Sequence, residues 1–128
     1  MANTIRTIAV YCGSNNGRKD SYKKCAAALG KSLALRKINI VYGGTNKGLM
    51  GVFANSAFKG GAKVTGVITE RLKAKGQVHP NLTVLETFPT MQSRKTRMIE
   101  LADAFIMMPG GVGTLEEFME VWTLNQLG

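Results

Sequence analysis

Two neighbouring carboxylates, Glu116 and Glu117, stand at the expected start of a helix that follows a glycine-rich turn at residues 109–113. An apolar run at residues 104–108 precedes the turn and reads as a buried strand. Glycines let the backbone approach an anion closely, and the unpaired N–H groups and positive dipole end of the helix face the same point. The stretch therefore predicts an anion-binding turn with two acidic side chains beside it.

This turn differs from two common phosphate-binding sequences. Gly111 and Gly113 are followed by Leu115 and Glu116 without a third glycine, so the dinucleotide fingerprint is not completed. No Gly-Lys-Ser or Gly-Lys-Thr follows the turn, which excludes a P-loop at this position.

A basic cluster, Arg94, Lys95 and Arg97, falls on the first turn of another expected helix, which begins near Ser93. Positive charge at this end of a helix opposes the helix dipole by a few tenths of a kcal/mol per residue. Two hypotheses remain open. The cluster is a flexible basic surface turn, or Arg94 and Lys95 reach toward an anion shared with the turn at residues 110–114.

Glu117 also has a purely structural interpretation. Thr114 and Glu117 fit a capping box, with threonine at the N-cap and glutamate at the third helical position. Glu116 favours a helix start because its charge complements the dipole. The residues alone leave both interpretations open, a helix cap and an acidic group of a reaction site.

The elements that must position these side chains alternate along the chain. We expect strands at residues 5–11, 38–42, 63–68, 81–86 and 104–108, and helices at residues 49–59, at residues 92–102 and from residue 114. A helix after the first strand is indicated by apolar residues at helical spacing: Tyr22, Cys25, Ala26, Leu29 and Leu33. Residues 69–80 read as a loop with one short helical turn, and His79 as a loop residue rather than a base.

Such alternation with short links predicts an α/β fold, a doubly wound and mostly parallel sheet in three layers. Glycine-rich turns at residues 13–17, 43–48 and 109–113 each follow an expected strand. The carboxyl ends of parallel strands lie on one edge of a sheet, and ligands bind there at the switch point. We therefore expect the three turns to converge.

Composition supports one domain over residues 1–128. With 45% hydrophobic residues and 15 glycines, the chain fits an α/β protein and is not disordered. Residues 1–7 carry one arginine before an apolar run of strand length, so we expect no secretory leader and no membrane span. Cys12 and Cys25 lack metal-ligand spacing and are expected to be buried, reduced thiols of a cytoplasmic protein.

The net charge of +9 is unevenly spread. Residues 1–40 hold eight Lys or Arg and one acid, whereas residues 98–128 hold five acids and no base. The lysines are not interleaved with aromatic residues, and no nucleic-acid-binding motif accompanies them. We therefore expect a solvated basic face rather than a nucleic-acid interface.

Three stretches together resemble the LOG family, the cytokinin-activating phosphoribohydrolases and their bacterial relatives. Residues 109–117, preceded by Arg94-Lys95, look like the PGGxGTxxE signature of that family. Residues 11–14, Tyr-Cys-Gly-Ser, and residues 42–51, with Gly43-Gly44 at their start, resemble its first two loops. The resemblance covers the whole chain and implies a Rossmann-like fold.

The resemblance also implies an activity: hydrolysis of the N-glycosidic bond of a purine riboside 5′-monophosphate to free base and ribose 5-phosphate. By position, Arg94 and Glu117 match the catalytic arginine and glutamate. Nucleotide-contacting positions of the family are matched by Lys95, Gly110, Gly111, Gly113, Thr114 and Glu116, and less closely by Ser14, Gly43, Gly44 and Thr123. Neither a metal nor a cofactor is implied. The family is often labelled lysine decarboxylase, but no pyridoxal-binding arrangement can be read in the chain.

The chain departs from the family pattern at three places. Gln92 stands where histidine is common, and Thr45 where glycine is frequent, which narrows the second turn. The chain stops at Gly128, whereas family members usually continue, so we expect a sheet that lacks its C-terminal strand and helices.

Partners follow from the same resemblance. It implies a purine nucleoside monophosphate substrate and a homodimer, in which an apolar face around Met98, Phe118 and Trp122 would take part. The alternative function is a non-catalytic carrier of a phosphorylated ligand on the same scaffold, like the related molybdenum-cofactor carriers.

Overall fold

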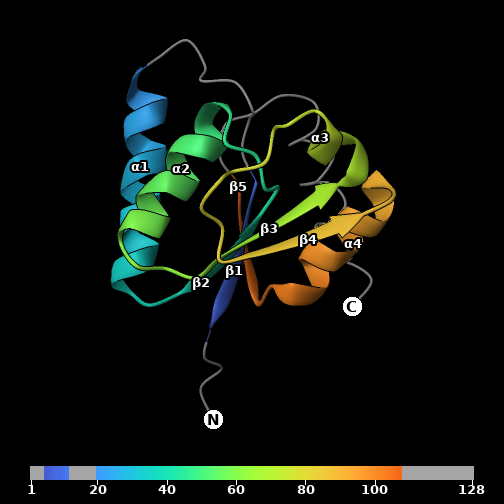
Figure 1. Cartoon of the computed structure of the whole chain (residues 1–128). Helices are drawn as coiled ribbons and strands as arrows, with labels where there is room; N and C mark the ends of the chain where they lie inside the picture. Colours follow the sequence, from blue (N-terminus) through green and yellow to red (C-terminus); the bar gives the residue numbers. More distant parts are fainter. Residues whose placement is uncertain (1–4, 12–19, 108–128) are drawn as a thin grey trace.

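The computed structural model describes residues 5–11 and 20–107. Strands and helices alternate through this part of the chain (Figure 1). In order they are β1 (Thr7–Tyr11), α1 (Asp20–Leu35), β2 (Asn39–Tyr42), α2 (Gly48–Lys59), β3 (Val64–Thr69), α3 (Glu70–Ala74), β4 (Val84–Phe88), α4 (Met91–Leu101) and β5 (Ala104–Met107).

The five described strands form one sheet in the order β4-β3-β2-β1-β5. Every neighbouring pair is parallel. The chain moves outward from β1 through β2 and β3 to β4, and then crosses back so that β5 pairs with the other side of β1. Ala9 at the centre of β1 therefore lies between Val41 and Phe105. The predicted parallel, doubly wound sheet is confirmed, with its switch point between β1 and β5.

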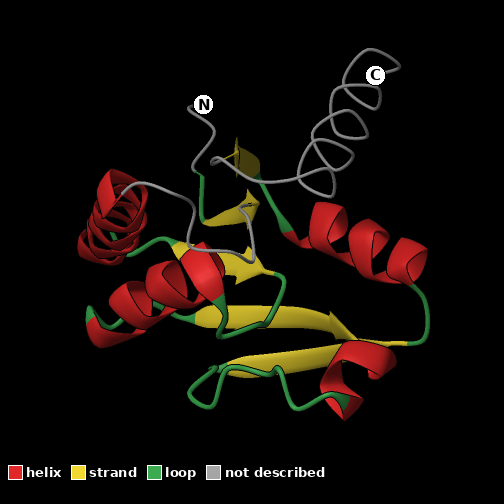
Figure 2. Cartoon of the chain, turned by 90° about the horizontal axis from the view of Figure 1, so that it is seen from above, coloured by secondary structure: helices red, strands yellow, loops and turns green. Residues whose placement is uncertain are grey.

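Helices cover both faces of the sheet, which confirms the three layers. Figure 2 shows α1 and α2 on one side and α4 on the other. Alternate residues of β1 point to opposite faces, as the two-residue period of a strand requires. Ile8 and Val10 belong to the core beneath α1 and α2, whereas Ala9 and Tyr11 belong to the core that α4 covers with Met98.

Two expectations about side chains are wrong. Cys25 was expected to be buried on the apolar face of the first helix, but it is an exposed free thiol. Ala26, its neighbour, is fully buried and occupies the centre of that face instead. Met98 was expected on an apolar surface, but it is 1% exposed and packs inside the domain, so it offers no surface to a second copy.

The segment between β3 and β4 was expected to be a loop with one short helical turn. It contains the expected short helical turn, α3, whose first turn is capped by the Thr69 side chain accepting a hydrogen bond from the Leu72 N–H. The strand expected at residues 81–86 is shifted and begins only at Val84. Residues 77–79, which precede it, are paired with the second glycine turn and not with the sheet.

Helix α4 begins at Met91, one residue before the expected range of 92–102. Thr90 is the N-cap and Ser93 the third helical residue, and their side chains and backbone N–H groups exchange hydrogen bonds as a capping box. The helix therefore starts just after β4 ends, at the carboxyl edge of the sheet. Arg94 lies at the end of its first turn.

Within the two described stretches, no helix combines the length and the apolar character needed to cross a membrane.

One carboxylate ties the starts of β1 and β5 together. Asp103 Oδ2 accepts hydrogen bonds from the N–H groups of Arg6 at 2.9 Å and Thr7 at 3.0 Å, while its own N–H donates to the Thr7 carbonyl at 2.8 Å. These contacts, the Arg6 N–H foremost, hold the pKa of Asp103 below its ordinary value of 3.8. The carboxylate therefore favours the folded state.

This contribution should depend on pH in a defined direction. Because the folded pKa is depressed, the stabilisation is complete above the ordinary carboxyl pKa and is lost as the pH falls through the lower folded value. Asp103→Asn keeps an oxygen acceptor but cannot titrate. We expect its melting temperature to lie a few degrees below wild type at pH 7 and to approach wild type in strong acid. Thermal melts followed by circular dichroism check this, and a constant difference across the pH range would contradict it.

Candidate functional site

Three adjacent strands lead into the three glycine-rich turns. Tyr11, the last residue of β1, is paired with Met107, the last residue of β5, and β2 lies on the other side of β1. The carboxyl ends of β2, β1 and β5 therefore lie side by side at one edge of the sheet. The first and third turns lie outside the described residues, so the convergence of the three turns stays a prediction.

Most of the expected signature also lies there. Eight residues assigned from the family resemblance fall outside residues 5–11 and 20–107, and their roles stay predictions: Ser14, Gly110, Gly111, Gly113, Thr114, Glu116, Glu117 and Thr123. The same holds for the expected dimer residues Phe118 and Trp122 and for Cys12. The described part of the site consists of Gly43, Gly44, Arg94, Lys95 and the residues that hold them.

The first three residues of the second glycine turn, residues 43–45, are buried and tightly held. Gly44 adopts a positive φ of 82°, a conformation that glycine accepts without strain. The Tyr42 hydroxyl donates to the Thr45 carbonyl at 2.8 Å, and the Thr45 hydroxyl accepts from the Lys47 N–H at 3.2 Å. Thr45 has no positive φ, so threonine at this position carries no backbone strain. These two hydrogen bonds fix the conformation of the turn.

Arg94 is buried against this turn, with 6% of its surface exposed. Its Nε donates to the Val67 carbonyl of β3 at 2.7 Å, and its Nη2 donates to the Gly43 carbonyl at 3.2 Å. Its Nη1 contacts the Met91 sulfur at 3.1 Å. A guanidinium stays charged inside a protein, and these acceptors fix its plane. The site therefore holds a fixed positive charge at the carboxyl edge of the sheet.

The fit between Arg94 and the turn leaves no room for a side chain at Gly43. A Cβ atom built there would collide with Nη2 of Arg94. Glycine is needed at this position because the guanidinium passes directly over the backbone, and not because of an unusual φ. Gly43 and Arg94 form one unit, although 51 positions separate them in the chain.

The hypothesis of a flexible basic surface turn is wrong for two of the three cations. Lys95 is 8% exposed and Arg94 6%, so both are buried in the domain. Burial of a charged group is costly unless polar partners surround it, which favours the hypothesis of a site over that of a solvated surface. The anion that Arg94 and Lys95 would share with the turn at residues 110–114 stays a prediction, because that turn lies outside the described residues.

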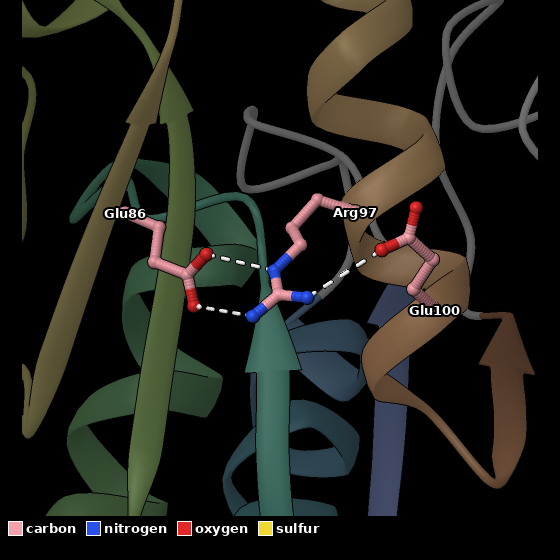
Figure 3. A network of polar contacts seen from close by, with 3 residues as sticks. All are labelled: Glu86, Arg97 and Glu100. Carbon is pink, nitrogen blue, oxygen red and sulfur yellow. Dashed lines mark hydrogen bonds and ion pairs between the residues drawn. The ribbon is translucent and has the colours of Figure 1, made fainter.

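Arg97 has a different environment, between α4 and Glu86 of β4 (Figure 3). Its Nε and Nη2 face the two oxygens of Glu86 on β4 at 2.8 and 3.5 Å, and its Nη1 faces Glu100 at 3.4 Å. The Glu86 contact raises the pKa of Arg97. Such half-exposed pairs contribute little to stability. Arg97 therefore links α4 to β4, and its partners differ from those of Arg94.

The structure adds two residues to the surroundings of the second turn, His79 and its partner Asn55. His79, expected to be a loop residue, is 3% exposed. Its Nε2 lies 2.7 Å from Oδ1 of Asn55 on α2, and its Nδ1 accepts a hydrogen bond from the Asn81 N–H at 3.0 Å. No periodicity or motif in the sequence distinguishes this histidine from a solvated one. Its role is visible only once residues 77–81 are seen against the second turn.

Among the described residues, no group of three or more His, Cys, Asp or Glu side chains is placed to bind a metal ion. The guanidinium of Arg94 and the ammonium of Lys95 suit an anionic ligand, whereas the Val67 and Gly43 carbonyls serve as acceptors for Arg94.

The chain is similar in sequence to proteins of known name. A sequence model with the description "Possible lysine decarboxylase" matches residues 50–128. The chain is 45% identical over 126 residues to the cytokinin riboside 5′-monophosphate phosphoribohydrolase of Rhodococcoides fascians, and 46% identical over 124 residues to the enzyme LOG of Oryza sativa subsp. japonica. These alignments cover 98% and 97% of this chain but 64% and 51% of the relatives. The chain thus spans about half to two thirds of their length.

Solved structures share the fold. The molybdenum cofactor binding protein from the phototrophic bacterium Rippkaea orientalis superposes with a TM-score of 0.75 at 23% identity, over 92% of this chain and 71% of that protein. The Moco carrier protein from Chlamydomonas reinhardtii gives a TM-score of 0.79 at 17% identity, over 92% of this chain and 70% of the carrier. Identities this low show the fold alone.

The family match runs from the first turn of α2 to the end of the chain, more than half of its length, and includes Arg94, Lys95 and the whole PGGxGTxxE stretch. The chain therefore belongs to the LOG family, whose sequence model bears the description "possible lysine decarboxylase".

Proposed function

We propose that this protein hydrolyses the N-glycosidic bond of a purine riboside 5′-monophosphate, either AMP or a cytokinin-type nucleotide, to free base and ribose 5-phosphate. The observation that carries the proposal is the buried guanidinium of Arg94, fixed between the Val67 and Gly43 carbonyls at the edge where the glycine turns begin. Relatives 45% and 46% identical to the chain bear the name of this activity.

The reaction needs a negative charge beside the sugar. Cleavage of a ribosyl C–N bond passes through an oxocarbenium-like state, which a fixed carboxylate stabilises. Glu117 is the proposed carboxylate and general base. It takes a proton from water as the water oxygen bonds to C1′, while the electron pair of the breaking C–N bond leaves with the base. The proton that Glu117 took from the water is then passed to the nitrogen of the departing base, which leaves neutral and returns Glu117 to its carboxylate form.

Arg94 is the proposed cationic partner. A guanidinium held over the Gly43 backbone presents a fixed donor to the nucleotide and favours the departure of the base by stabilising developing negative charge. Because its contacts with β3 and the second turn are already made, the group needs no reorganisation during the reaction. Lys95, buried beside it, is proposed to contact the nucleotide as well.

The 5′-phosphate is proposed to bind the main-chain amides of the third turn. Glycines and the helix start there offer N–H groups to an anion. The contributing residues are Gly110, Gly111, Gly113, Thr114 and Glu116, with Ser14, Gly43, Gly44 and Thr123 lining the rest of the site. Binding energy from the phosphate would position the ribose at the reacting groups. Nucleosides without the phosphate should therefore react poorly.

Product analysis of a substrate panel tests the proposal. AMP, an N6-substituted AMP and the corresponding nucleosides are each incubated with the protein, and free base and ribose 5-phosphate are measured by chromatography. We expect both products from the monophosphates and none from the nucleosides. Saturable nucleotide binding without base release over hours would instead support the non-catalytic carrier, and absence of binding would contradict both.

Gly43→Ala tests the geometry of the site. The added methyl group collides with Nη2 of Arg94, so the guanidinium must move. We expect base release to fall about tenfold or more, since small misplacements of reacting groups are costly. The control is the double variant with Arg94→Ala. Once the guanidinium is gone, Gly43→Ala should cost nothing further, and additive losses would contradict the coupling.

We also propose that the protein acts in the cytoplasm as a homodimer. The exposed free thiol of Cys25 suits a reducing compartment. The dimer rests on the family resemblance, and light scattering coupled to gel filtration tests it. A monomer that is active in the substrate panel would contradict it.

A further inference from the structure

The second glycine turn is held from outside by residues 77–79. The Asn46 N–H donates to the Gln77 carbonyl at 3.3 Å, and Thr45 forms an isolated antiparallel bridge with Val78. The His79 N–H then donates to the Gly44 carbonyl at 2.8 Å. The turn and this segment are therefore one structural unit, although α2, β3 and α3 separate them in the chain.

Two consecutive carbonyl groups of the turn have different partners. The Gly43 carbonyl accepts from Nη2 of Arg94 at 3.2 Å, and the Gly44 carbonyl accepts from the His79 N–H at 2.8 Å. Gly43 and Gly44 are consecutive and both buried, so we expect a displacement of the Gly44 carbonyl to displace the Gly43 carbonyl as well. The position of residues 77–79 therefore affects the position of the Gly43 carbonyl, which accepts a hydrogen bond from Arg94.

The ring of His79 fastens this segment to the body of the domain. Its Nδ1 accepts from the Asn81 N–H at 3.0 Å, which requires Nδ1 to be unprotonated. In the neutral ring the proton is then on Nε2, which donates to Asn55 Oδ1 at 2.7 Å. One nitrogen closes the local turn and the other ties it to α2. Both ring nitrogens are satisfied in only one tautomer.

We propose that His79 is a positioning residue for Arg94: its neutral ring, bonded to Asn55, clips residues 77–81 to α2 and so holds the Gly43–Gly44 backbone on which the guanidinium is set. The activity assays of this role rest on the proposed function, whereas a structural measurement does not. His79 contacts Asn55, the Asn81 N–H and the Gly44 carbonyl, and the proposal gives it no part in the reaction itself. Burial lowers the pKa of His79, which keeps the ring in its neutral form near neutral pH.

Two substitutions of His79 separate the functions of the ring. His79→Gln places an amide N–H near the position of Nε2 and keeps the bond to Asn55. His79→Asn keeps an acceptor near the position of Nδ1 and loses that bond. Asn55→Ala removes the same bond from the other side. Asn55 is exposed, so this variant is expected to fold even if substitutions at the buried histidine do not.

We expect His79→Asn and Asn55→Ala each to lower kcat about tenfold with KM changed less than about twofold, because the guanidinium moves while nucleotide binding remains. His79→Gln should stay within about threefold of wild type. The double variant of His79→Asn and Asn55→Ala should be no worse than either single variant. Lys59→Ala, which removes an exposed side chain one turn further along α2, is the matched control and should match wild type.

A structural readout separates this inference from the proposed function. The Arg94 Nε–H, bonded to the Val67 carbonyl, is followed by ¹⁵N NMR for its chemical shift and its exchange with solvent. We expect a shifted resonance and faster exchange in Asn55→Ala and His79→Asn, but not in His79→Gln or Lys59→Ala. If wild type releases no base, the function fails and this measurement still decides the inference. An unchanged Arg94 signal in Asn55→Ala overturns it.

Discussion

Arg94→Lys is expected to lower the rate of base release at least about 100-fold, because an ammonium cannot replace a guanidinium that is fixed on two carbonyls. Lysine keeps the charge and much of the length. It has no counterpart of the Nε donor to Val67 or of the planar arrangement that reaches Gly43. The charge would remain in the site, but its position would not be defined.

Arg97→Lys is the matched control. It changes the same residue type on the same helix, one turn away, at a half-exposed salt bridge with Glu86 and Glu100. We expect activity within about twofold of wild type, since such surface pairs contribute little. Steady-state assays of the two variants with one nucleotide, alongside thermal melts, make the comparison. Equal losses would mean that α4 as a whole, and not the Arg94 guanidinium, is responsible.

Glu117→Gln is expected to reduce base release by about 1000-fold, because an amide can neither take a proton from water nor stabilise positive charge on the ribose. Glutamine at the third helical position still completes a capping box, so a purely structural Glu117 would tolerate the change. Single-turnover assays should show bound nucleotide that is not cleaved.

Glu120→Gln, one turn further along the same expected helix, is the control for Glu117→Gln and should leave the rate unchanged. A Glu117→Gln variant with wild-type turnover would refute the catalytic assignment and leave the helix cap as the reason for the residue. The fold and the family would stand in either case.

Much of the architecture could be read from the sequence because it depends on local periodicity. Apolar runs of strand length, helical spacing from Tyr22 to Leu33 and glycine-rich turns after three of the strands predicted the parallel sheet and its three layers. The Arg94-Lys95 pair with the PGGxGTxxE stretch identified the family. In these cases the information lies within a few residues of the chain.

What the sequence could not settle are the contacts between distant segments. Nothing near Arg94 reveals that its guanidinium lies on the Gly43 carbonyl, and nothing near His79 shows that its N–H pairs with Gly44. The same holds for three further differences from expectation: the late start of β4, the burial of Met98 and the exposure of Cys25. Each depends on which surface a neighbouring element covers. Turn chemistry and periodicity are local, but the burial of a charge or a ring is decided by the packing of the whole sheet and its helices.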